Sequence, residues 1–564
     1  MFRNLNALAQ KQFDVLVIGG GIYGAAVTWE AASRGLSVAL VEKDDFCGAT
    51  SANSLKTIHG GLRYLQHADF QRMRESISER TTLMRIAPHL IHPLPVLVPT
   101  YGHRLKGREV MALATFANDL ISFDRNLPDP EKRLPHGYTI SRRECLQRLP
   151  GIPENNLTGG AVFYDAQAYN TERLVIDFLH SAVQSGAEVA NYVQAVGFRR
   201  QANKVIGIEA RDHLTGSTFD IQARMIINTA GPWVNSVLGL LGPAQPPAQL
   251  ALSMNIITRP LFERFAVGLS APKSYQDADA LLNKGNRLLF FSPWRDRSLI
   301  GTTADPYHGA PDNFEITETE VQRFLNEINQ AYPAANLTLD DVTFVHAGLL
   351  PSPGIDHKSG DARIAKHYQL IDHRQAGIDG LLTVVGVKYT TARHVAEKVI
   401  DHVSTRQEKP LPKSTSAMTR LHGGQIDRFD DFLQTAVQQQ PCGLDASTLR
   451  HLVYTYGSNY PTVLQSFDMQ TTANLGMTRS LLQAETRHAV RQEMAQTLGD
   501  VLFRRTDWGS AGHPGAEVVA FTAEVMAAEL GWTPDHTRQE IEAVNTRFAF
   551  GRGTYAAALA GSTL

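Results

Sequence analysis

Three glycines near the start of the chain have the spacing of a loop that binds the phosphates of a dinucleotide. They are Gly19, Gly21 and Gly24. They follow the apolar run 13–18 and open the alanine-rich segment 23–35, as in a strand–turn–helix unit. Glycine there permits a tight turn, close backbone approach to a pyrophosphate and close helix packing, and the helix N-terminus attracts the phosphates. Glu42, which ends the next apolar run, is placed to accept hydrogen bonds from a ribose hydroxyl.

Two later segments favour FAD over NAD as this dinucleotide. Residues 48–54 are small and polar, and such a run, with Thr50 and Ser51, lets the backbone and hydroxyls follow an extended dinucleotide. A second glycine-marked turn, which begins at Gly386, offers another helix N-terminus suited to the electron-rich pyrimidine side of a flavin. We therefore predict FAD as the cofactor. A nicotinamide enzyme, which would carry no yellow chromophore, is the alternative.

Several motifs occur in order along nearly the whole chain. They are Ile18-Gly-Gly-Gly-Ile-Tyr-Gly24, Lys56-Thr-Ile-His-Gly-Gly-Leu-Arg-Tyr-Leu65, Asn228-Thr-Ala-Gly-Pro-Trp-Val234, Ile300-Gly-Thr-Thr303, Gly386-Val-Lys-Tyr-Thr-Thr391, Tyr454-Thr-Tyr-Gly-Ser-Asn459 and Phe503-Arg-Arg-Thr506. Together they resemble the FAD-dependent glycerol-3-phosphate dehydrogenases, and the run 58–65 is specific to that family. The resemblance implies oxidation of sn-glycerol 3-phosphate to dihydroxyacetone phosphate. Electrons then pass through FAD to a membrane quinone or, in some members, to oxygen.

Three side chains in these motifs suit the oxidation of an alcohol. Hydride transfer from a secondary alcohol carbon needs a group that takes the hydroxyl proton and cations that orient an anionic substrate. The resemblance assigns these catalytic roles to His59, Arg63 and Lys388, of which the guanidinium grips phosphate and the ammonium supplies a point charge. The structural alternatives are a packed histidine, a salt-bridged arginine and a solvated lysine. We also expect Gly61, Gly231 and Thr390 to contact FAD.

The presumed phosphate pocket departs from the family pattern. Family members usually have arginine where this chain has Leu350, often histidine where it has Asn255, and arginine where it has Lys366. Because a charged hydrogen bond contributes about 1.5–3 kcal/mol, loss of a bidentate arginine costs about a hundredfold in binding. Either Lys366, Arg393 or Arg63 compensates, or the substrate is another small hydroxy or amino compound. We count Asn255, Lys366, Lys388, Arg393 and Arg63 as substrate-binding candidates.

His346 is a further titratable group, beside the expected flavin-facing turn. In one interpretation it acts as the base, and in the other it packs under the sheet. The identity of the base stays open between His346 and His59. A flavin protein without turnover is a third functional class, but it has no reason to keep His59, Arg63 and Lys388 together.

The apolar patterns predict a Rossmann-like α/β domain interleaved with an antiparallel-sheet substrate domain and followed by a helical domain. Short buried runs indicate parallel strands at 13–18, 36–41, 225–229 and 380–385. Alternating runs indicate antiparallel strands at 288–303 and 341–349. We expect the FAD-binding domain at 1–100, 155–240 and 345–405, the substrate domain at 101–154 and 241–344, and the C-terminal helices at 414–564, after a proline-containing linker at 407–416.

Composition excludes several classes of protein. The 564 residues include 54 basic and 56 acidic side chains, which argues against a polycation that coats nucleic acid. The 3 cysteines are far apart, so neither a disulfide scaffold nor a cysteine-rich zinc site is expected, and no metal is predicted. The N-terminal residues 1–12 do not read as a secretory signal, and 225–258 is too polar for a transmembrane helix.

A membrane contact is the interpretation that a quinone acceptor favours. Cations at 103–108 precede the apolar stretch 110–121, and basic residues beside an amphipathic segment dock on anionic lipid. The alternative is a solvated loop before an ordinary core helix. We expect a cytoplasmic protein, peripheral on the inner face of the cytoplasmic membrane, and allow for a homodimer.

Overall fold

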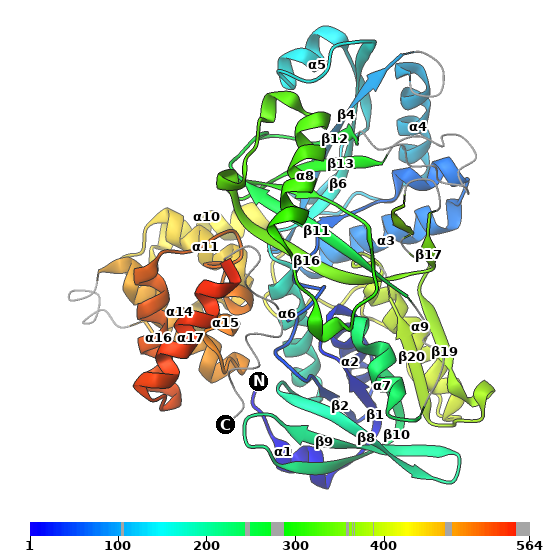
Figure 1. The fold of residues 1–564 in the computed structure, drawn as a ribbon, viewed down its shortest axis with the longest axis vertical. Coiled ribbons are helices and arrows are strands. Elements are labelled where there is room, and N and C mark those ends of the chain that lie inside the picture. Colours follow the sequence, from blue (N-terminus) through cyan, green and yellow to red (C-terminus); the bar gives the residue numbers. More distant parts are fainter. Residues whose placement is uncertain are drawn as a thin grey trace.

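The structure is a computed structural model of the 564-residue chain. It describes residues 1–102, 107–242, 249–271, 287–356, 360–363, 365, 367–386, 388–467 and 476–548, with the backbone alone at 63, 66 and 67. Two sheets lie next to each other, and the C-terminal helices pack at one side of both (Figure 1). None of the described helices is long and apolar enough to cross a bilayer.

The first sheet has the parallel centre that the sequence predicts. Its strands run in the order β19-β20-β10-β1-β2-β7, and all neighbours except β19 and β20 are parallel. Their bounds are β1 Gln12–Ile18, β2 Val38–Val41, β7 Glu188–Ala190, β10 Thr218–Asn228, β19 Gln369–Asp372 and β20 Leu381–Val385. A hairpin of β8 (Val193–Gln201) and β9 (Lys204–Asp212) extends it through β10.

Alternate residues of β1 face two different cores, as the period of a strand requires. Val15 and Val17 point to the helices α2 (Ile22–Ser33), α6 (Thr171–Gln184) and α9 (Ala392–Arg406), which form one layer. Leu16 and Ile18 face the β8–β9 hairpin on the other side. The alanines of α2 let it lie close to the sheet, which brings its N-terminus to the ends of β1 and β10.

The second sheet is mostly antiparallel, with the order β15-β11-β14-β13-β12-β4-β6-β3, while β16 pairs with β11 and β5 with β6. The bounds are β3 Thr57–Ile58, β4 Ile91–Tyr101, β5 Tyr138–Ser141, β6 Leu157–Ala168, β11 Gln249–Thr258, β12 Ala266–Ser270, β13 Leu288–Trp294, β14 Arg297–Gly301, β15 Asp305–Tyr307 and β16 Val342–Ser352. Helix α8 (Glu318–Ala331) packs its apolar face into the core of this sheet.

The sheets divide the chain differently from the predicted ranges. Strands β3 and β6 and most of β4 come from 1–100 and 155–240, which we assigned to the FAD-binding domain, yet they pair within the second sheet. Most of strand β16, from 345–405, does the same through β11. An apolar run shows that a strand is buried but not which sheet it joins, because pairing is decided by partners far away in sequence. The fold class is confirmed, and the domain boundaries stay a prediction.

The C-terminal part is helical, as predicted. It contains α10 Phe429–Gln439, α11 Ala446–Tyr456, α12 Tyr460–Leu464, α14 Met477–Glu493, α15 Leu498–Asp500, the π-helical turn η11 Val501–Arg505, α16 Ala516–Leu530 and α17 Pro534–Phe548. Buried ion pairs tie these helices to the loop after β2 and to α6. Arg504 and Arg505 of η11 contact Asp45 at 2.5 and 2.6 Å, and Glu493 contacts Arg173 at 2.7 Å.

Candidate functional site

The glycine loop between β1 and α2 has a backbone that only glycine accommodates. Gly19 has a φ of +106°, in the left-handed region. A Cβ on Gly24 would lie 1.8 Å from the carbonyl oxygen of Gly19, so this first turn of α2 must pass directly over the loop. Gly21 is the N-cap of α2 and carries no side chain between the helix N-terminus and the space in front of it. This cradle fits a pyrophosphate.

A cavity of about 670 Å³ lies in front of this loop, between the two sheets. Predicted FAD contacts that line it are Gly19, Gly21, Glu42, Thr50, Ser51, Gly231 and Gly386, and predicted substrate residues that line it are Asn255 and Lys388. Leu350 also lines it. Gly24 lies behind the loop, while Gly61 and Thr390 are outside the lining. The predicted residues thus lie on several parts of the cavity wall, and their roles toward FAD and substrate stay predictions.

Glu42 sits in the cavity wall at the end of β2. Its carboxylate accepts hydrogen bonds from the backbone amides of Gly20 at 2.6 Å and Asp44 at 3.0 Å. Burial, and next the charge of Asp44, raise the pKa of Glu42 to about 7. A hydroxyl donor in the cavity would stabilise the ionised form, which suits the ribose role predicted for this residue.

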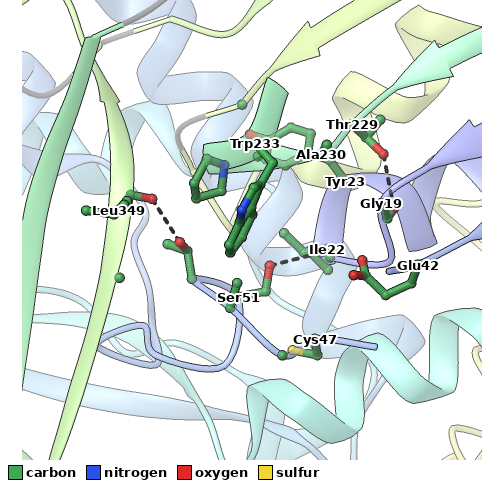
Figure 2. Close-up of a pocket in the computed structure, with 18 of the residues that line it drawn as sticks. Gly19, Ile22, Tyr23, Glu42, Cys47, Ser51, Thr229, Ala230, Trp233 and Leu349 are labelled. Atoms are coloured by element: carbon green, nitrogen blue, oxygen red, sulfur yellow. Dashed lines mark hydrogen bonds between the residues drawn. The ribbon is translucent and has the colours of Figure 1, made fainter. Parts of the chain in front are cut away.

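The loop after β2 is held between the two sheets by its hydroxyls. Ser51 Oγ accepts from the amide of Ile22 at 3.0 Å, and Thr50 Oγ1 donates to the carbonyl of Leu349 at 2.8 Å (Figure 2). Gly348 of β16 allows this approach, since a Cβ there would lie 2.9 Å from Thr50 Cα. The two hydroxyls thus position the loop, and its backbone remains to face a cofactor.

A bridge that the sequence did not predict crosses the cavity. Trp233 ends the short turn η4 (Gly231–Trp233), and its Nε1 donates to Asp312 Oδ1 at 2.7 Å. Lys43 Nζ lies 4.1 Å from the centre of the tryptophan ring and 2.7 Å from the same carboxylate oxygen. Figure 2 shows the Trp233 ring in the middle of the cavity, between Leu349 and Glu42. Asp312 lies between β15 of the second sheet and α8, so this bridge joins the two sides of the cavity. In the sequence, the motif around Trp233 was the one sign of it.

Lys388 stands at the late turn between β20 and α9. Tyr23 of α2 holds this turn, because its hydroxyl donates to the Lys388 carbonyl at 2.8 Å. A Cβ on Gly386 would lie 2.2 Å from the Tyr23 ring, which explains the glycine. Burial, followed by the charge of Arg72, lowers the pKa of Lys388 to about 8. Its ammonium lies 4.6 Å from the ring centre of Tyr64, in the helical turn η1 (Leu62–His67).

His59 lies just before η1 and is paired with a buried carboxylate. Its Nδ1 is 3.0 Å from Asp165 Oδ2, and its side chain is 45% exposed. Asp165 also accepts from the Gly60 amide at 2.6 Å and from Arg80 at 3.0 Å. Burial alone would raise the pKa of Asp165, but His59, Arg80 and the Gly60 amide outweigh it and lower that pKa. The pair leaves Nε2 of the imidazole for another partner. Nothing in the local sequence pointed to Asp165.

Three predicted catalytic or substrate-binding residues with described side chains do not line the cavity: His59, His346 and Arg393. His346 is buried beneath the second sheet, with Nε2 2.8 Å from the Ser510 carbonyl, and burial lowers its pKa to about 3. Arg393 is buried against Glu79, at 2.6 Å, and against Glu397, at 2.9 Å. The base role for His346 and the phosphate role for Arg393 are thus at odds with where the fold places these side chains. Lys366 and the side chain of Arg63 lie outside the described residues.

The fold and the cavity define a FAD-dependent oxidoreductase. Residues 14–395 match the family model described as FAD dependent oxidoreductase, and residues 414–537 match the C-terminal domain of alpha-glycerophosphate oxidase. The cofactor is FAD. More narrowly, the chain belongs to the family of FAD-dependent glycerol-3-phosphate dehydrogenases and alpha-glycerophosphate oxidases.

Relatives match over almost the full length. A glycerol-3-phosphate dehydrogenase of Synechocystis is 31% identical over 96% of this chain and 97% of its own. An alpha-glycerophosphate oxidase of Lactococcus lactis is 28% identical over 96% of each chain. The crystal structure of the Bacillus halodurans glycerol-3-phosphate dehydrogenase complexed with FAD is 26% identical, covers 96% of each chain and superposes with a TM-score of 0.75.

Proposed function

We propose that this protein oxidises sn-glycerol 3-phosphate to dihydroxyacetone phosphate and passes the electrons to a membrane quinone. The observation that carries the proposal is that Lys388 and His59, from distant parts of the chain, both lie at the turn η1. Lys388, from the wall of the FAD cavity, lies against Tyr64 of this turn, and His59 immediately precedes it with a buried carboxylate behind its ring. The names of the full-length relatives support the same substrate.

The side chains of this site have separate roles in the oxidation of the alcohol. The substrate loses a hydride from its secondary carbon and a proton from the hydroxyl on that carbon, and bound FAD supplies the hydride acceptor. His59 takes the hydroxyl proton at Nε2 while Nδ1 donates to Asp165. Asp165 stays ionised between Arg80 and the Gly60 amide, so it stabilises the imidazolium that forms. Lys388 orients the anionic substrate.

An anaerobic absorption spectrum tests the substrate. We expect the flavin band of the purified holoenzyme to bleach when sn-glycerol 3-phosphate is added without air, and glycerol at the same concentration to leave it unchanged. A yellow protein that glycerol 3-phosphate does not bleach would contradict the proposal. In that case the leucine at position 350 of the cavity wall would mark a site for another hydroxy or amino compound.

The acceptor has its own test, because dehydrogenases and oxidases share this fold. The substrate-reduced enzyme is mixed in a stopped-flow instrument with either a ubiquinone analogue or air-saturated buffer. We expect the quinone to reoxidise the flavin much faster than oxygen does. Reoxidation by oxygen at an equal or higher rate, with formation of hydrogen peroxide, would make the protein an oxidase.

A membrane-facing surface is the second part of this proposal. Helix α4 (Arg108–Ile121) and the residues after it expose an apolar face made of Leu113, Phe116, Leu120 and Phe123, which are 66–79% exposed. Figure 1 shows α4 at the edge of the molecule, on the side away from the C-terminal helices. Such a face on one helix is typical of an interfacial segment. The expected cations 103–106 lie outside the described residues, and Arg108 begins the helix.

The position of α4 relates this apolar face to electron transfer. The helix packs against η1, the turn that follows His59 and carries Tyr64. Phe70, which begins the helix after η1, α3 (Phe70–Ile86), is a further exposed apolar side chain, at 55%. A bilayer at this face would therefore bring its quinone close to the substrate end of the cavity.

Vesicle binding tests the surface. We expect the wild-type protein to sediment with vesicles that contain phosphatidylglycerol, and the double variant Phe116→Glu/Leu120→Glu to stay in solution with unchanged flavin reduction. Leu214→Glu, at an exposed leucine in the turn after β9, is the matched control and should still bind. Unchanged sedimentation of the double variant would contradict the proposal. So would a wild-type homodimer that this variant dissociates, because the face would then be a subunit interface.

A further inference from the structure

Two cations lie against the same aromatic ring at the substrate end of the site. Lys388 Nζ is 4.6 Å from the ring centre of Tyr64, and the guanidinium carbon of Arg72, in α3, is 5.0 Å from it. Arg72 Nη2 is also 2.8 Å from Nε2 of His367, in the segment that leads into β19. Three basic side chains from three separate segments therefore meet around Tyr64. Neither the sequence motifs nor the family resemblance marked Arg72 or His367.

This cluster is electrostatically costly without an anion. Burial and next the charge of Arg72 lower the pKa of Lys388 to about 8, and burial, Arg72 and Lys388 together lower the pKa of His367. Like charges held together at a half-buried site lower one another's pKa in this way. A bound anion would reverse this cost. Of the three basic side chains, Lys388 lines the cavity, and Arg72 and His367 lie beyond its lining.

The carboxylates nearby do not saturate the cations. Asp69 pairs with Arg72 Nη2 at 2.6 Å, and the more distant Glu75 acts on Lys388 only through its charge. Arg72 is about nine-tenths buried, and its Nε has no hydrogen-bond partner among the described residues. By contrast, Arg393 is fully engaged by Glu79, Glu397 and a serine. Among the described residues of α3, Arg72 and Arg80 each keep an Nε without a partner, but Arg80 is fully buried against Asp165, whereas Arg72 lies beside Lys388 and His367.

We propose that Arg72, His367 and Lys388 bind the phosphate group of the substrate, and that Arg72 supplies the guanidinium that the chain lacks at Leu350. This inference rests on the proposed function, whose substrate is a phosphate monoester. The chain neighbours of the two positions are connected: the carbonyl of Pro351, next to Leu350, accepts the amide of Ala365, two residues before His367, and His367 contacts Arg72. A guanidinium, an ammonium and an imidazole that share one anion match the multiple acceptor oxygens of phosphate.

The test measures anion binding without turnover. Inorganic phosphate, and acetate as a carboxylate probe, are titrated into the oxidised holoenzyme, and Kd is taken from the perturbation of the flavin spectrum. We expect phosphate to bind more tightly than acetate. Arg72→Met should raise the phosphate Kd about tenfold or more, because it removes charged hydrogen bonds. Arg74→Met, two residues along α3 at a partly exposed pair with Asp124, is the matched control and should leave Kd unchanged.

A second variant keeps the proposal falsifiable if Arg72→Met folds poorly. His367→Asn alters an exposed side chain and should raise the phosphate Kd severalfold without loss of FAD. A phosphate Kd that neither variant changes, or tighter binding of acetate than of phosphate, would overturn the anion site. If phosphate binding depends on Arg72 but glycerol 3-phosphate does not bleach the flavin, the anion site stands and the proposed function fails. If glycerol 3-phosphate bleaches the flavin with unchanged affinity in both variants, the function stands and this inference fails.

Discussion

The imidazole of His59 and the carboxylate of Asp165 are joined by a hydrogen bond of 3.0 Å between Nδ1 and Oδ2, across 106 positions of sequence. The carboxylate is buried and the imidazole half exposed, so the pair presents one ring nitrogen outward and anchors the other. Arg80 and the Gly60 amide satisfy the second carboxylate oxygen, which fixes the orientation of the whole pair. This is the arrangement that a general base requires.

Asp165→Asn should therefore slow flavin reduction without weakening substrate binding. We expect the rate constant for reduction by glycerol 3-phosphate to fall by about tenfold to a thousandfold, because the imidazolium loses its charged partner. The Kd for substrate, from the same stopped-flow series, should stay within about threefold. Asp165→Glu, which retains the charge, should recover part of the rate.

The pair His89–Asp177 provides a matched control for this variant. Here the imidazole uses Nε2 rather than Nδ1, at the same distance of 3.0 Å from a carboxylate oxygen, and the pair is fully buried, with Asp177 in α6. Asp177→Asn should lower the melting temperature and leave the reduction rate per bound FAD unchanged. A reduction rate that survives Asp165→Asn would remove His59 from the role of base.

Glu42 makes the stability of the apoprotein depend on pH. Its folded-state pKa is about 7, above the ordinary value of 4.5, so between these values the folded state retains a proton that the unfolded chain has lost. Stability of the apoprotein should consequently fall as pH rises from 4.5 to 7, by up to about 2 kcal/mol once the partial exposure of the side chain is allowed for.

The variant Glu42→Gln separates the loss of stability caused by ionisation of Glu42 from the contribution of this residue to cofactor binding. The variant apoprotein should melt at a higher temperature than the wild type at pH 8 and at the same temperature near pH 4, while it retains less FAD after gel filtration. The measurement is a thermal denaturation series over pH, together with the ratio of flavin to protein absorbance. A variant that loses stability at pH 8 would contradict an unfavourable ionised Glu42 in the apoprotein.

The C-terminal helices should contribute to cofactor retention through Asp45. This carboxylate lines the FAD cavity and is held by Arg504 and Arg505. Burial would raise the pKa of Asp45, but Arg505 and Arg504 outweigh it and lower that pKa to about 2. The stabilisation is therefore complete above about pH 3.8 and is lost as pH falls through 2.

Replacing one arginine partner of Asp45 should reveal whether the C-terminal helices contribute to cofactor retention. We expect Arg505→Met to destabilise the protein by about 3–5 kcal/mol, because it leaves buried charge uncompensated, and to reduce the FAD content. Arg487→Met, at the more exposed pair with Glu529, should change neither quantity appreciably. Differential scanning calorimetry and flavin fluorescence released on heating measure both effects. Full FAD retention in a destabilised Arg505→Met protein would limit the C-terminal helices to a structural role.

The sequence predicts those parts of the site whose residues lie close together along the chain. Gly19, Gly21 and Glu42 lie within one strand–helix–strand unit, so their spacing alone specifies a dinucleotide cradle. Gly386 was predictable for the same reason, in a turn that joins a buried strand to a helix, whereas Lys388 came from the family resemblance. These positions needed no knowledge of which strands pair.

The part that sequence missed depends on contacts between distant segments. Asp165 reaches His59 because β3 pairs with β6, and Asp312 reaches Trp233 because both line the cavity between the two sheets. The opposite error has the same origin: His346 and Arg393 have suitable side chains near the expected turn. Their strand and helix turn them towards Ser510 and Glu79 instead, and residue type does not reveal which face is buried.

Leu350→Arg tests whether position 350 and Arg72 serve one anion site. If Arg72 supplies the missing guanidinium, an arginine at 350 should lower the phosphate Kd by about tenfold in the Arg72→Met background. In the wild-type background it should change Kd by less than about threefold, because the anion already has its cations and the added charge repels Lys388. The Kd values of the four proteins, from flavin perturbation, form a double-mutant cycle. An equal effect of Leu350→Arg in both backgrounds would mean that the two positions act at independent sites.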